Sequence, residues 1–217
     1  MENGFIILFG LTMLYLAATS RIAAHLRLLV IQGVLLFLIC ACNFHHQSAL
    51  NIAFLTVETL IVKSIVIPWF LFKVVRKTRA NRDIGANIPH FYCLVIASII
   101  LLAGFLVPNY FINSGTMKMI SPIYFGVSVA TIIISLWLIT IKHKIISNVI
   151  EFITMENGIF LLSLSVAKEM PVLVNMGVLL DVFIAIYILG LFINEINREF
   201  NDLEVSNLSD LKDYSND

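Results

Sequence analysis

The sequence predicts an all-α fold, a polytopic transmembrane helical bundle of about seven helices. Hydrophobic residues make up 59% of its 217 residues and charged residues only 13%. The mean hydropathy of +0.95 lies well above that of a typical water-soluble domain. The apolar residues also fall in continuous runs that are long enough to cross a bilayer core of roughly 30 Å. Lipid is therefore the expected solvent for most of the chain.

Each run qualifies as a span because about 20 residues in helix cross the bilayer core. A helix also satisfies every backbone N–H and C=O within the segment, which the apolar solvent requires. No Lys or Arg precedes the first run, and further runs follow it, so we expect a retained helix rather than a secretory signal. The predicted spans are residues 4–20, 28–44, 50–72, 91–107, 123–140, 145–166 and 172–192.

Lys and Arg are distributed unequally between the connections. The second, fourth and sixth connections contain only Lys118 and Lys168. The other side contains Arg21, Arg27, Lys73, Arg76, Lys77, Arg79, Arg82, Lys142, Lys144, Arg198 and Lys212. Because such an excess marks the cytoplasmic side, we expect the N-terminus outside and the C-terminus inside, in the inner (cytoplasmic) membrane. Residues 1–192 then form one transmembrane domain, and residues 193–217 form a polar cytoplasmic tail.

Five ionisable side chains fall inside the predicted spans. A charge near the bilayer centre is costly, so such residues are expected to face the bundle interior, a partner or water. Glu58 and Lys63 lie about 140° apart around an α-helix, which disfavours an ion pair between them. Pro68 has no N–H for the Ser64 carbonyl and predicts a bend just beyond Lys63. The five residues are Glu156, Asp181, Lys63, Glu58 and Glu151.

Small and hydroxylated residues accompany these charges. Gly177 and Ala185 flank Asp181 by four residues on either side, and small residues let another helix approach closely. In the sixth predicted span, Gly158 shares one helical stripe with Glu151 and with further polar residues. The stripe consists of Ser147, Glu151, Thr154, Gly158 and Ser165. This pattern predicts a face that is either closely packed or wetted.

The intramembrane charges have two interpretations. In the first they form a proton relay, because desolvation disfavours the charged form of carboxylates and lysines and promotes proton exchange. In the second they pair statically and hold helices or subunits together. Four of them, Glu58, Lys63, Glu156 and Asp181, lie at similar depth, which favours the relay.

Soluble-type catalysis and metal binding are not predicted. Cys40 and Cys42 point about 200° apart on a helix, and His25, His90 and His143 lie in or beside connections. We find no phosphate-binding loop and no nucleophile elbow. We therefore expect no catalytic residue, no cofactor and no metal. Equal numbers of acidic and basic residues give no indication of a nucleic-acid partner.

Three segments that contain these charges resemble the hydrogenase-4 component E family. They are residues 58–70 (ETLIVKSIVIPWF), 156–162 (ENGIFLL) and 173–191 (LVNMGVLLDVFIAIYILGL). Members of that family are membrane subunits of complex-I-like, energy-converting [NiFe] hydrogenases such as formate hydrogenlyase. The length and the number of predicted spans also agree with the family.

Within this resemblance, residues 123–192 are similar to the three-helix K-type subunit of complex I and to the C subunit of multisubunit cation/proton antiporters. Glu156 matches the carboxylate in the middle helix of that subunit, and Asp181 matches the one in its last helix. Two positions depart from the pattern: residue 181 is Asp rather than Glu, and Asn175 stands where many relatives would have Glu.

The resemblance implies a non-redox subunit that contributes to proton translocation. Its expected partners are antiporter-like large subunits, a complex-I-like membrane anchor and, indirectly, a [NiFe] hydrogenase arm. Two alternatives stay open at this point. In the first alternative the chain is a subunit of a cation/proton antiporter. In the second it is a purely structural assembly subunit.

Overall fold

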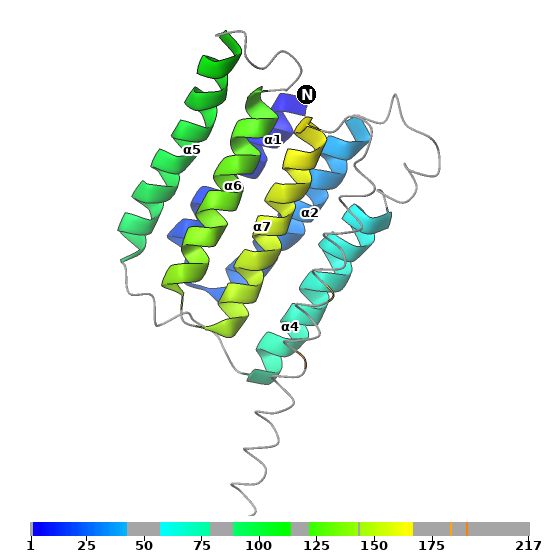
Figure 1. The fold of residues 1–217 in the computed structure, drawn as a ribbon. Coiled ribbons are helices and arrows are strands. Elements are labelled where there is room, and N and C mark those ends of the chain that lie inside the picture. The colour runs from blue at the N-terminus through cyan, green and yellow to red at the C-terminus, as the bar shows by residue number, and fades with distance from the viewer. Residues whose placement is uncertain are drawn as a thin grey trace, which may run out of the picture. The chain divides into compact units, whose positions relative to one another are not determined.

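A computed structural model describes residues 2–42, 57–78, 89–113, 122–142 and 144–166, together with residues 183 and 190. The chain divides into two compact units, Met1–Val178 and Leu179–Asp217. All helices considered below belong to the first unit (Figure 1). Apart from residues 183 and 190, the predicted seventh span lies outside the described residues, as do Asp181 and the polar tail, and all of these stay predictions.

Every regular element that the structure describes is a helix, as predicted. The helices are α1 (Glu2–Ala18), α2 (Ile22–Cys42), η2 (Val57–Val66), α4 (Ile67–Thr78), α5 (His90–Asn113), α6 (Pro122–Ile141) and α7 (Ile145–Val166).

Four of these described helices are long and apolar enough to cross a membrane. The qualifying segments are Ile22–Cys42, Phe91–Pro108, Pro122–Ile141 and Ile145–Ser165. Asn3–Ala18 is apolar but shorter. The chain is therefore a multi-pass membrane protein, as its composition predicts. The count of seven spans and the orientation of the termini remain predictions.

The third predicted span differs from expectation in its winding. Its described part is a π-helix, η2, that continues as the α-helix α4. The change falls directly before Pro68, whose missing N–H interrupts the hydrogen-bond ladder. Hydrogen bonds in a π-helix join residues five apart. Glu58 and Lys63 therefore lie one helical turn apart in the backbone, and the 140° separation expected from α-helical geometry is wrong.

Helix α1 contacts α2, α5 and α6, and Leu8, Leu11 and Tyr15 lie on its exposed face. Helix α2 also packs against η2, α4 and α7, while α6 lies between α5 and α7 (Figure 1). Two apolar clusters fill the space between these helices. Phe9, Leu36 and Phe160 belong to one of them, and Met13 and Ile134 belong to the other. The polar side chains described below lie among these apolar layers.

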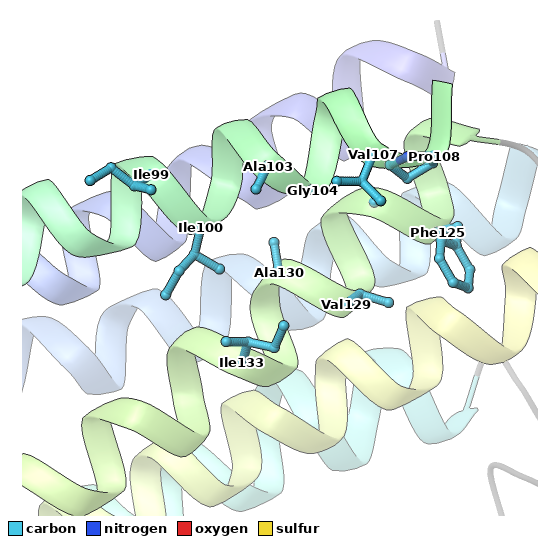
Figure 2. Close-up of a pocket in the computed structure, with 11 residues that line it drawn as sticks. Ile99, Ile100, Ala103, Gly104, Val107, Pro108, Phe125, Val129, Ala130 and Ile133 are labelled. Carbon is cyan, nitrogen blue, oxygen red and sulfur yellow. The ribbon is translucent and has the colours of Figure 1, made fainter. Parts of the chain in front are cut away.

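Glycines mark the closest helix contacts. A Cβ atom on Gly104 of α5 would lie 2.6 Å from the carbonyl oxygen of Gly126 on α6, and a Cβ on Gly126 would overlap the carbonyl oxygen of Gly104. Small residues permit such approaches within a membrane. Beside this crossing, apolar side chains line a cavity of about 330 Å³ between the two helices (Figure 2).

A similar contact brings η2 against α2. A Cβ atom on Gly33 would lie 2.9 Å from the Cα atom of Ser64. The Ser64 hydroxyl donates a hydrogen bond of 3.4 Å to the Val30 carbonyl. This close approach fixes the height of Lys63, the residue before Ser64, relative to α2.

Candidate functional site

Buried polar side chains form two groups within the first unit. The end cluster consists of Thr19, His25, Lys142 and Glu151, where the α1–α2 and α6–α7 connections meet. The inner cluster consists of Thr12, Gln32, Lys63, Glu156 and Asn157, deeper among the helices. Burial of so many polar groups in an apolar chain requires partners or water, so both groups are candidate functional sites.

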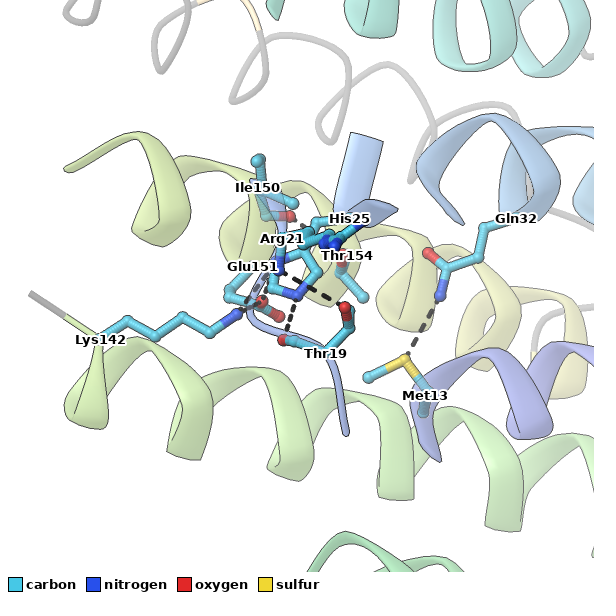
Figure 3. Close-up of polar contacts among 9 residues, drawn as sticks. All are labelled: Met13, Thr19, Arg21, His25, Gln32, Lys142, Ile150, Glu151 and Thr154. Carbon is cyan, nitrogen blue, oxygen red and sulfur yellow. Dashed lines mark hydrogen bonds and ion pairs between the residues drawn. The ribbon is translucent and has the colours of Figure 1, made fainter. Parts of the chain in front are cut away.

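Glu151 is the centre of the end cluster. Its side chain is fully buried, and its Oε1 atom accepts a short hydrogen bond from the Lys142 ammonium (Figure 3). The Lys142 Nζ atom also lies 3.2 Å from Nδ1 of His25. The lysine thus joins a carboxylate of α7 to an imidazole of α2.

The contacts of His25 define its protonation state. Its Nε2 atom lies 2.9 Å from the Thr19 carbonyl oxygen. Because a carbonyl oxygen only accepts hydrogen bonds, Nε2 carries the hydrogen. Nδ1 then presents a lone pair, which accepts a hydrogen bond from Lys142. These contacts fit a neutral imidazole with its hydrogen on Nε2, beside a lysine–glutamate ion pair.

Two tight helix connections bring these residues together. The Lys142 N–H donates to the Leu138 carbonyl and closes the last turn of α6, and α7 begins three residues later at Ile145. Glu151 then lies about 9 Å along α7. At the same end, the Thr19 N–H closes the last turn of α1. The short turns let Lys142 and Thr19 reach back along the neighbouring helices.

Gln32 connects three helices in the inner cluster. Its Nε2 atom donates to the Thr12 hydroxyl at 2.9 Å and to the Met13 sulfur at 3.4 Å, both on α1. Its Oε1 atom accepts a hydrogen bond of 3.3 Å from the Asn157 amide on α7. Gln32 lies seven residues after His25, so both side chains leave the same face of α2.

Lys63 and Glu156 reach the same region from different helices. The Lys63 ammonium lies 4.5 Å from the centroid of the Phe160 ring, within the range of a cation–π contact. Phe160 follows Glu156 by one turn on the same face of α7. Lys63 is 4% exposed and Glu156 is 2% exposed. A cation of η2 and a carboxylate of α7 are thus both buried, the cation against a ring one turn from the carboxylate.

The structure separates the predicted site residues into the two clusters. Glu151 lies in the end cluster, whereas Lys63 and Glu156 lie in the inner cluster. Because Glu151 and Glu156 are five residues apart on an α-helix, they face directions about 140° apart. Asp181 and the side chain of Glu58 lie outside the described part of the chain.

Six members of the clusters are absent from the sequence-based candidates, and His25, Lys142 and Gln32 make the most contacts among them. His25 was expected in or beside a connection; it lies in the first turn of α2, beside the α1–α2 connection, and is fully buried. Lys142 was predicted only as one of the basic residues in the connections, but its side chain is buried. Gln32 was not considered. The spacing of seven residues between His25 and Gln32 in a mostly apolar run is the signal that would have indicated them.

The predicted stripe on α7 packs against α6. A Cβ atom on Gly158 would lie 2.9 Å from Cγ2 of Thr131. Ser147 and Thr154 on α7 and Ser135 on α6 are fully buried near this contact line. The Ser135 and Ser147 hydroxyls have no hydrogen-bond partner within the described residues. At Gly158, the stripe is therefore a close-packing face.

No group of three or more His, Cys, Asp or Glu residues able to hold a metal ion occurs within the described ranges. Cys40 and Cys42 lie on α2, and Cys93 lies on α5. The described site offers acidic, basic and cationic side chains.

Comparison with known proteins identifies distant relatives. The chain is 24% identical over 191 residues to the uncharacterized protein Rv0085 of Mycobacterium tuberculosis, which covers 88% of this chain and 86% of that protein. It is 27% identical over 189 residues to hydrogenase-4 component E of Escherichia coli and to that of Shigella flexneri, each covering 79% of this chain and 86% of the relative. No protein-family model matches the chain, and no solved structure matches it significantly. The chain is thus distantly homologous to hydrogenase-4 component E.

Proposed function

We propose that the chain is a non-redox membrane subunit of a membrane-bound [NiFe] hydrogenase complex and that its buried charged residues form part of a proton path. The distant homology to hydrogenase-4 component E supports membership in such a complex. The observation that carries the path is the burial of Lys63 and Glu156 in one region, on two different helices. Ionisable groups at such depth are characteristic of proton relays.

The path would run from the end cluster to the inner cluster. Glu156 lies about 7.5 Å beyond Glu151 along α7. The Gln32–Asn157 hydrogen bond lies at a similar height, between α2 and α7. Side-chain amides cannot exchange net protons readily, but they can hold water molecules that do. Asp181 and Glu58 would continue the path on the remaining helices.

The partners in this proposal are antiporter-like large subunits and a complex-I-like membrane anchor. The resemblance of residues 123–192 to the K-type subunit of complex I belongs to the same proposal. Helix α5 offers room for a neighbour, since only 22% of its apolar span is buried within the chain, compared with at least 50% for α2, α6 and α7. Lipid or another subunit would cover the rest.

A structural role is the second candidate, and the end cluster favours it. The Lys142–Glu151 ion pair joins α6 to α7 and, through His25, to α2. Such a pair can fix helix positions without moving protons. Under this alternative the chain would hold other subunits in place, whether in a hydrogenase or in a cation/proton antiporter.

Purification of the native complex tests the assignment to a hydrogenase. We expect a [NiFe] subunit, iron–sulfur proteins and large membrane subunits to co-purify with the chain. A stable complex that contains antiporter subunits but no [NiFe] protein would reject the hydrogenase in favour of the antiporter.

The substitution Glu156→Gln tests the path. Glutamine preserves the shape and the hydrogen-bonding capacity of the side chain but does not take up protons near neutral pH. We expect the variant complex to assemble with normal composition, while proton translocation in reconstituted vesicles falls about ten-fold or more. Normal translocation would exclude Glu156 from the path and favour the structural role.

A further inference from the structure

We infer that His25 is the group through which Glu151 exchanges protons, with Lys142 and His25 alternating as partners of this carboxylate. This inference rests on the proposed proton path. It adds His25 to that path as the group that exchanges protons with Glu151. Neither the resemblance nor the relatives point to His25. The argument depends on the positions of three atoms, namely Nδ1 of His25, Nζ of Lys142 and Oε1 of Glu151 (Figure 3).

The ring of His25 has one site for an additional proton. Nε2 already donates to the Thr19 carbonyl, so a second proton must bind Nδ1. That nitrogen lies 3.2 Å from the Lys142 ammonium, which has three N–H groups and no lone pair. A protonated Nδ1 would direct its hydrogen at another cation. Protonation of His25 and its present contact with Lys142 are therefore mutually exclusive.

Glu151 offers the alternative partner. Its Oε1 atom lies 3.7 Å from the same Nδ1 atom, slightly beyond hydrogen-bond distance. A small rotation of the imidazole would form an N–H···O bond to this oxygen. Lys142 can yield by rotation of its side chain, since it directly follows the last residue of α6.

The proposed exchange conserves its protons. A hydronium ion gives its proton to Nδ1 and becomes water, the hydrogen bond from Lys142 to Nδ1 breaks, and a hydrogen bond from Nδ1 to Oε1 of Glu151 forms. Transfer of that proton to Oε1 leaves a neutral imidazole and a neutral carboxylic acid. Glu151 then no longer holds Lys142 by charge, and release of its proton toward the inner cluster restores the ion pair.

Other charged or titratable groups lie on the elements around the ring. Arg21 is exposed and precedes α2. Cys93 on α5 is buried and lies close enough to Lys142 to sense its charge. Among the described residues around His25, the negative charge comes from Glu151. The carboxylate is thus the group that attracts a protonated imidazole.

Nitrogen NMR of the full-length chain in lipid bilayers tests the geometry directly. With ¹⁵N-labelled histidine and lysine, the signal of His25 among the five histidines is assigned by its loss in His25→Gln. Between about pH 8 and about pH 5, we expect Nδ1 to gain a proton and the through-space contact with Lys142 to disappear. An Nδ1 atom that stays unprotonated over this range would overturn the inference. So would a contact with Lys142 that persists after both ring nitrogens are protonated.

Proton translocation by the native complex in vesicles provides the second test. The amide of His25→Gln can still donate to the Thr19 carbonyl but cannot carry a proton. We expect translocation to fall about ten-fold or more in this variant and to stay normal in the control Arg21→Gln. Normal translocation in His25→Gln with loss in Glu156→Gln would overturn this inference alone. Normal translocation in both variants would overturn the proposed path as well. If His25→Gln fails to assemble, the NMR result on the unaltered chain decides.

Discussion

Gln32 of α2 accepts a hydrogen bond from Asn157 of α7, 125 positions later in the chain, and donates another to Thr12 of α1. One amide therefore connects three helices within the apolar interior. The Thr12 hydroxyl accepts from Gln32 and donates to the Phe9 carbonyl at 2.6 Å, so its hydrogen goes to the backbone and its lone pair to the amide. Because partners with suitable geometry are rare in such surroundings, this network selects one register of the three helices.

The substitution Gln32→Leu should destabilise the protein by about 1–3 kcal/mol, because it leaves the Asn157 amide without this acceptor. The free energy of unfolding in mixed micelles measures the effect. The double variant Gln32→Leu with Asn157→Leu should recover most of the loss, since removal of both partners leaves no buried amide. Strictly additive losses would show that the two side chains do not interact.

The substitution Lys63→Met tests the inner cluster. Methionine has a similar length but no charge, so the cation–π contact with Phe160 disappears together with the countercharge in the region of Glu156. We expect proton translocation to fall about ten-fold or more, accompanied by a destabilisation of about 0.5–2 kcal/mol. The matched control is Lys73→Met, which removes an exposed lysine of α4. If Lys63→Met prevents assembly while Lys73→Met does not, the structural role is favoured.

Hydropathy predicted the described spans well, because lipid requires every crossing segment to be a long apolar helix. The apolar runs at 123–140 and 145–166 coincide almost residue for residue with α6 and α7. The start of α2 was misplaced by six residues, because His25 and Arg27 interrupt the apolar run although the helix passes through them. A charge that finds a partner inside the protein does not end a helix, and hydropathy alone cannot detect that partner.

The candidate site was predictable only in part for the same reason. The burial of Lys63, Glu151 and Glu156 follows from their positions inside long apolar runs. The burial of Lys142 depends on a turn that directs its side chain back toward Glu151, which is a tertiary feature. The π-helical winding at Lys63 likewise arises beside the close contact of Ser64 with Gly33, a contact between separate segments.

The substitution Lys142→Met should destabilise the protein by about 3–5 kcal/mol, because it removes the cation that compensates a fully buried carboxylate. Replacing both partners, as in Lys142→Met with Glu151→Leu, should recover most of this stability while proton translocation stays impaired. Thermal unfolding in detergent measures the first effect, and the vesicle assay measures the second. A double variant with normal translocation would exclude the end cluster from the path. The substitution Lys144→Met, two residues beyond Lys142, is the matched control.

The substitution Gly126→Ala tests the close crossing of α5 and α6. The added methyl group would overlap the Gly104 carbonyl oxygen, which belongs to the backbone and cannot rotate away, so the helices must separate. We expect a loss of about 1–3 kcal/mol, as for other overpacked contacts. Gly4→Ala on α1 is the control, since a Cβ atom there meets nothing within 4 Å and alanine favours helix. In mixed micelles, the free energy of unfolding of Gly126→Ala should lie well below that of the unaltered chain. The free energy of unfolding of Gly4→Ala should equal or exceed it. Equal stability of the two variants would mean that α5 and α6 do not cross at these glycines.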